Sequence, residues 1–157
     1  MNFMKYWKVI RQYYKTKFKL SQSDLDMLFF MYSEDYFTAN RFKEFSRIIG
    51  WDKNRFMRMR DSGWFEIFRK ATGNTAAIYI MSDKGRHLVD DIYRKLNGHD
   101  LPATICNNPM IKRKARYSDK VMVDMIAEMR EYNRENYVKR QKGRRLVNKP
   151  RQRQPPE

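Results

Sequence analysis

Residues 61–86 read DSGWFEIFRKATGNTAAIYIMSDKGR and contain the clearest local signals of secondary structure in the chain. Two runs rich in aromatic and branched residues, 64–69 and 75–81, predict short β-strands. Residues 71–74 lie between the runs and contain the turn signal Gly73-Asn74. Ser82 follows the second run and is a suitable N-cap for a helix. The stretch therefore predicts an antiparallel hairpin that leads directly into a helix.

Three helices are predicted before this hairpin. Ser21 is a good N-cap for the first, and Thr38 for the second, which Gly50 ends. Asp52 follows at once and predicts a third helix over residues 52–62. Apolar residues recur at helical spacing in the first two helices and in the helix after the hairpin: Leu25, Leu28, Phe29, Tyr32, Phe42, Phe45, Ile49, Leu88, Val89, Ile92 and Leu96.

The outer segments have their own patterns. Residues 1–20 predict an amphipathic helix, and residues 98–117 a connector that contains the cluster Lys112-Arg113-Lys114-Arg116. Residues 118–140 predict a last helix, and residues 141–157 a basic, disordered tail. The N-terminal helix has a basic stripe and an aromatic stripe, the second more typical of packing than of base stacking: Lys5, Lys8, Lys15 and Lys19, then Phe3, Trp7, Ile10 and Tyr14.

The charge balance indicates a polyanionic partner. The chain of 157 residues has a formal net charge of +16, which repels itself in a folded protein unless an anion compensates it. A basic protein without such a partner is the simpler alternative. A membrane surface is a weaker third option. No stretch approaches the ~20 apolar residues that a membrane-spanning helix requires, and we expect no membrane partner.

The order of three helices, a hairpin and a helix predicts a fold that is mainly α with a small β-hairpin. Specifically, we expect a winged helix-turn-helix over residues 21–97, with extra N- and C-terminal helices. Residues 61–65 and 80–86 also resemble the wing entry and wing exit of MarR-type DNA-binding regulators. That resemblance implies a homodimer, or contact with neighbouring proteins, through the N-terminal and C-terminal helices.

The helix over 52–62 is the predicted nucleic-acid reader. If Phe56 and Met59 face the core, helical spacing turns four residues outward: Lys53, Asn54, Met57 and Arg58. Asn54 suits adenine, and Arg58 suits guanine or a phosphate. Other basic residues are expected on phosphates, near this helix or in the tail: Arg41, Arg47, Arg69 and Lys70, then Lys142, Arg144 and Arg145. A purely solvated helix face is the alternative.

These features favour a nucleic-acid-binding protein over an enzyme. The sequence has a single cysteine, two histidines without acidic partners at ligand spacing, and no glycine-rich phosphate loop. We therefore expect no catalytic residue, metal or cofactor. The first hypothesis is a transcriptional regulator that binds DNA in the cytoplasm or nucleoid. The alternative is a structural component of a large nucleoprotein assembly, such as a phage virion, in which the winged helix is a packing module.

Overall fold

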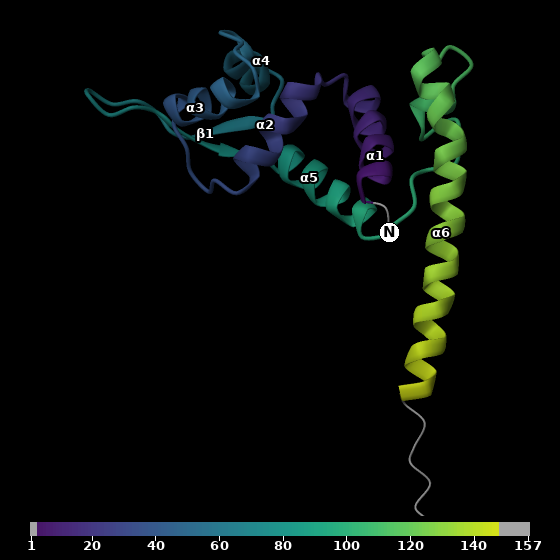
Figure 1. The fold of residues 1–157 in the computed structure, drawn as a ribbon. Helices are drawn as coiled ribbons and strands as arrows, with labels where there is room; N and C mark the ends of the chain where they lie inside the picture. The colour runs from purple at the N-terminus through teal and green to yellow at the C-terminus, as the bar shows by residue number, and fades with distance from the viewer. Residues whose placement is uncertain (1–2, 148–157) are drawn as a thin grey trace, which may run out of the picture.

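The protein is mainly helical, with a small antiparallel sheet of two strands (Figure 1). The computed structural model describes residues 3–147, with side chains described as far as Lys139. The elements are, in order, α1 Phe3–Phe18, α2 Gln22–Tyr32, α3 Ala39–Ile49, α4 Arg55–Asp61, β1 Phe65–Arg69, β2 Ile78–Met81, α5 Asp83–Leu96, the short 3₁₀ helix η1 Pro109–Ile111, and α6 Tyr117–Val147.

Side-chain caps begin three of these helices, as the sequence predicts. Ser21 and Asp24 form a capping box at the start of α2, because each side chain accepts a hydrogen bond from the other residue's backbone N–H. Thr38 Oγ1 accepts from the N–H of Arg41 at 3.3 Å, and Ser82 Oγ accepts from that of Gly85 at 3.3 Å. Each cap contributes about 1 kcal/mol and fixes where its helix begins.

An aromatic cluster holds α3, α4 and the sheet together. The ring of Phe42 on α3 lies 5.2 Å from that of Phe56 on α4 and 5.6 Å from that of Phe65 on β1. Tyr79 of β2 meets Phe56 edge-on, with the ring centroids 5.0 Å apart. All four side chains are buried. This packing fixes the position of α4 relative to the hairpin.

The sheet has a third, single-residue contact that the sequence did not indicate. Phe65 pairs with Met81 in the β1–β2 ladder, which has an irregularity between Ile67 and Arg69. On the other side of β2, Phe37 forms an isolated bridge with Tyr79, with N···O distances of 3.0 and 2.8 Å. The segment between α2 and α3 is therefore tied to the hairpin, which projects from the helices as a thin arm (Figure 1).

The helix α1 packs within the chain through its aromatic face. Its buried residues are Tyr6, Val9, Ile10, Tyr13 and Tyr14, whereas Phe3, expected on this face, is 55% exposed. The hydroxyl of Tyr14 donates a hydrogen bond to Asp91 on α5. On the opposite side, α6 runs alongside α1 and continues beyond it (Figure 1).

Two helix boundaries differ from the sequence prediction. The helix expected over 52–62 begins at Arg55, because Asp52 forms the preceding turn by accepting a hydrogen bond from the N–H of Asn54 at 2.9 Å. The helix expected over 118–140 extends from Tyr117 to Val147. It takes in residues 141–147 of the expected disordered tail, since adding residues to an existing helix requires no new nucleation. Residues 148–157 of that tail lie outside the described residues.

The connector over 98–117 is folded against the helices. Leu101 and Met110 are buried in the core, the second completely. The buried side chain of Asn108 donates a hydrogen bond to the carbonyl of Pro102 and accepts one from the N–H of Met110, both at 3.0 Å. These contacts hold η1 against α1 and so bring the basic cluster that follows η1 close to α1.

Candidate nucleic-acid interface

The helix α4 and the turn before it present an exposed polar edge. Phe56 and Met59 are buried, as expected, which leaves Lys53, Asn54 and Met57 exposed. Asn54 occupies the N-cap position, but its side chain makes no capping hydrogen bond. Within the described part of the chain, neither Lys53 nor the Asn54 side chain has a hydrogen-bonding or ionic partner. Both side chains are available to a ligand.

Arg58, by contrast, is engaged within the protein. Its Nη2 lies 2.8 Å from Asp24 Oδ1 on α2, and its Nη1 lies 3.0 Å from Asp52 Oδ2. The hydrogen bonds with Asp24 and then with Asp52 raise the pKa of Arg58 above its ordinary value. The guanidinium therefore orients α4 on α2, and it can reach a base only by exchanging these partners.

Arg55 is a buried cation that no pattern in the sequence predicts. Its Nη1 donates to Ser46 Oγ at 2.9 Å and to the carbonyl of Gly50 at 2.6 Å. Its Nε lies 3.5 Å from Asp24 Oδ1. Arg55 therefore joins the end of α3 to the start of α4. The sequence contains no local signal for this role, because an arginine at the start of a helix is ordinarily solvated.

Of the expected phosphate contacts on α3, Arg41 is paired and Arg47 is not. Arg41 lies 3.0 Å from both Glu34 and Glu44, and its guanidinium covers the ring of Phe45 at 4.5 Å. The hydrogen bonds with Glu34 and then Glu44 raise the pKa of Arg41. Arg47 is exposed and has no ion pair within residues 3–139. Arg47 is thus the more accessible cation of the two.

The hairpin arm carries the next two expected contacts. Arg69 ends β1 and Lys70 follows it, and both side chains are exposed without an ion pair in the described region. The tip beyond them is closed by the Thr72–Thr75 bridge, with Gly73 at φ 54°. The tip itself carries no charge, so the basic residues lie at the outer end of the β1–β2 ladder, directly before the tip.

The three expected contacts in the tail fall in the last turns of α6. Lys142, Arg144 and Arg145 belong to the helix, but their side chains lie outside the described residues.

Apolar side chains are exposed beside the polar edge of α4. Ile48 near the end of α3, Trp51 in the following turn and Met57 on α4 are 72%, 63% and 46% exposed. Large exposed apolar side chains that occur together mark interaction surfaces. The exposed residues of α3, α4 and the turn between them therefore include both hydrogen-bonding groups and large apolar side chains.

Other kinds of site find no support in the described chain. No group of three or more histidine, cysteine or acidic side chains within residues 3–147 is placed to hold a metal ion. None of the helices described there combines the length and hydrophobicity needed to cross a bilayer. No protein-family model, curated protein sequence or solved structure matches this chain.

Proposed function

We propose that residues 21–97 form a winged helix-turn-helix of the MarR type, and that the protein is a transcriptional regulator that binds DNA. The observation that carries the proposal is the exposed edge of α4, supported on one side by α3 and on the other by the hairpin. The Phe37–Tyr79 bridge supports it further, because it ties the helices to the hairpin as one rigid unit.

In this proposal, α4 enters the major groove, which is wide enough to admit a helix. The amide of Asn54 pairs with an adenine edge, and Lys53 contacts a guanine or a phosphate beside it. Arg47 on α3 binds the flanking phosphates and sets the register, together with Arg69 and Lys70 at the outer end of the β1–β2 ladder. Arg41 and Arg58 do not contact DNA in this proposal, because they form ion pairs with Glu34 and Asp24 that hold the helices together.

The homodimer expected from the MarR resemblance is part of this proposal. The aromatic face of α1 is buried within the chain, so it offers little area to a partner. Exposed apolar residues remain at the start of α1 and along α6: Phe3, Met4, Val121 and Val138. We therefore place the contact with a second copy, or with a neighbouring protein, on these residues.

Selection from a random duplex library tests the regulator directly. The full chain is expected to enrich particular sequences, and Lys53→Ala/Asn54→Ala is expected to abolish the enrichment while retaining nonspecific affinity. Asn97→Ala/Lys139→Ala removes the same residue types from exposed positions, the C-cap of α5 and a site on α6, and it is expected to enrich the wild-type sequences. A wild-type protein that enriches no sequence contradicts base reading by α4.

A second candidate function is a structural role in a nucleoprotein assembly such as a virion. The exposure of Ile48, Trp51 and Met57 favours it, because a packing surface uses apolar contact area that a base reader does not need. Under this alternative, Ile48→Ser/Trp51→Ser abolishes protein–protein association in sedimentation experiments, and DNA binding shows no sequence preference. Under the regulator proposal, the same variant keeps its sequence preference.

A further inference from the structure

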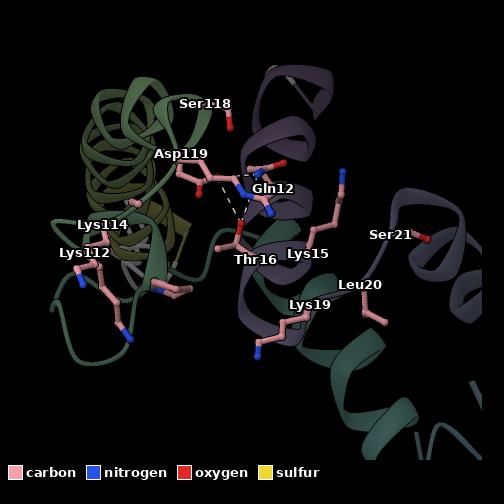
Figure 2. Close-up of a pocket in the computed structure, with 13 residues that line it drawn as sticks. Gln12, Lys15, Thr16, Lys19, Leu20, Ser21, Lys112, Lys114, Ser118 and Asp119 are labelled. Atoms are coloured by element: carbon pink, nitrogen blue, oxygen red, sulfur yellow. Dashed lines mark hydrogen bonds between the residues drawn. The ribbon is translucent and has the colours of Figure 1, made fainter. Parts of the chain in front are cut away.

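A basic groove lies between α1 and the segment that runs from η1 into α6 (Figure 2). Its volume is about 750 Å³. Lys15 and Lys19 line it from α1, and Lys112, Lys114 and Arg116 line it from the other side. In the sequence these cations belong to two separate basic segments. The fold brings them to the two walls of one groove.

The groove holds five cations and one carboxylate. Within residues 3–139, none of the five has an ion-pair partner. The carboxylate, Asp119, is buried and bound to α1: its Oδ1 accepts hydrogen bonds from Gln12 at 2.6 Å and from Thr16 at 3.4 Å (Figure 2). Like charges placed together repel one another, and an anionic ligand relieves that repulsion.

Lys19 has a backbone conformation that favours glycine. Its φ is 55°, in the left-handed region, and within residues 3–147 it is the only residue other than glycine with positive φ. It directly follows α1, and the next N–H, that of Leu20, bonds to the carbonyl of Lys15 at 3.1 Å. Glycine is the usual residue at this position, because a side chain there is strained. A lysine here costs stability but supplies a cation to the groove.

A second hollow of about 370 Å³ adjoins the groove at Pro109 and Lys112. It adds Lys17 of α1 to the basic lining. The two hollows form one track along α1. Apart from Asp119, every charged side chain that lines the two hollows is a cation, so the track suits a chain of anionic groups.

A series of contacts between neighbouring residues links the lining of the groove to α4. Ser21 lines the groove and forms the capping box with Asp24, and Asp24 is the buried partner of Arg58 on α4. Figure 1 shows α4, the end of α1 and the start of α6 toward the same end of the molecule. A ligand that contacts α4 therefore has a short path over the start of α2 into the groove.

We propose that this groove binds the phosphodiester backbone of the DNA that contacts α4, and so extends the footprint beyond the winged helix. This inference rests on the proposed function, and it assigns the ligand of a second site. The groove neutralises phosphates without reading bases. Lysines suit this role because each acts as a point charge on a flexible stem.

Salt dependence measures this contribution. The test uses the full chain, a DNA duplex of about 30 base pairs, or some three helical turns, and Lys112→Gln/Lys114→Gln. Each phosphate contact contributes about one unit to the slope of log K against log salt, so this variant is expected to lower the slope by about 2 units. The control Arg134→Gln/Lys139→Gln makes the same charge change on exposed positions of α6 and is expected to lower the slope by less than about half a unit.

The variant Lys19→Gly distinguishes a loss of DNA binding from a loss of stability. The change removes the backbone strain and one groove cation together. We expect a higher unfolding temperature and a weaker affinity for the duplex. Opposite shifts of this kind exclude loss of fold as the cause of weaker binding. A Lys19→Gly protein with wild-type affinity and an unchanged salt slope contradicts the proposal.

The outcomes distinguish a failure of the groove proposal from a failure of base reading by α4. If the groove variant lowers the slope while Lys53→Ala/Asn54→Ala leaves sequence preference unchanged, the groove is supported and base reading by α4 fails. If the groove variant and its control have equal slopes, the groove proposal is overturned while α4 is unaffected. A groove variant that loses affinity for inorganic tripolyphosphate, but not for the duplex, overturns it in favour of a small phosphate ligand. A wild-type chain that binds no duplex overturns both.

Discussion

The guanidinium of Arg58 on α4 lies 2.8 Å from the buried carboxylate of Asp24 on α2. Asp24 also closes the capping box of α2 and lies 3.5 Å from the buried Arg55. One carboxylate therefore sets the start of α2 and the orientation of α4. The edge of α4 that faces solvent follows from this contact.

Replacing Arg58 tests whether its contact with Asp24 stabilises the packing of α4 on α2. We expect Arg58→Ala to lower the free energy of unfolding by about 1.5 kcal/mol, because it removes a charge-assisted hydrogen bond from a buried acceptor. Asn54→Ala removes a side chain without a described partner, and we expect a change of less than about 0.5 kcal/mol. Chemical denaturation of the two variants measures both values. Equal stabilities would show that the Arg58–Asp24 contact does not orient α4.

Gly85 is required by close packing at the start of α5. A Cβ at this position would lie 2.7 Å from Met81 Cγ and 3.2 Å from the carbonyl oxygen of Trp64. We expect Gly85→Ala to destabilise the protein by about 1–2 kcal/mol, since overpacking outweighs the gain in helix propensity.

A double-variant cycle identifies the clash at Gly85. If Met81 is the obstacle, Gly85→Ala/Met81→Ala is less destabilised than the sum of the two single variants. Additive effects in thermal unfolding would place the cost elsewhere. The residue belongs to the stretch 80–86 that resembles the wing exit of MarR-type regulators, so the packing gives that glycine a structural reason.

Alkaline stability depends on Tyr14. Burial, and then the hydrogen bond with Asp91, raise the pKa of Tyr14 well above its ordinary value of 10.0. Its contribution is fully present below pH 10.0 and is lost as the pH rises, because the unfolded chain releases the proton first. We expect Tyr14→Phe to be less stable at neutral pH, but to lose stability less steeply above pH 10.0. Urea denaturation at several pH values measures this, with the exposed Tyr36→Phe as control.

Local patterns were sufficient to predict the elements and several of their boundaries. Ser21, Thr38 and Ser82 cap helices as expected, and the two strands lie within the expected runs. These features depend on neighbouring residues, so the sequence carries their signals directly. The start of α4 was misplaced because Asp52 forms a turn before the helix.

Contacts between distant residues had no such signal. The Phe37–Tyr79 bridge, the burial of Arg55 and the pairing of Arg58 with Asp24 all depend on how the helices pack. Helical spacing predicts that Arg58 faces outward, but it does not predict that the Asp24 carboxylate lies beside it, because Asp24 is on another helix. The groove is a similar case, since Lys15 and Lys112 are far apart in the sequence but line the same groove from its two walls.

The salt dependence of duplex binding by the full chain shows whether this protein binds nucleic acid through its basic surfaces. If about six phosphates are neutralised, log K should fall linearly with log salt at a slope near −5. We expect that slope with random duplexes and a further gain in affinity with selected ones. A slope near zero, or no binding at micromolar protein and low salt, would show that the basic surfaces of this protein do not bind nucleic acid.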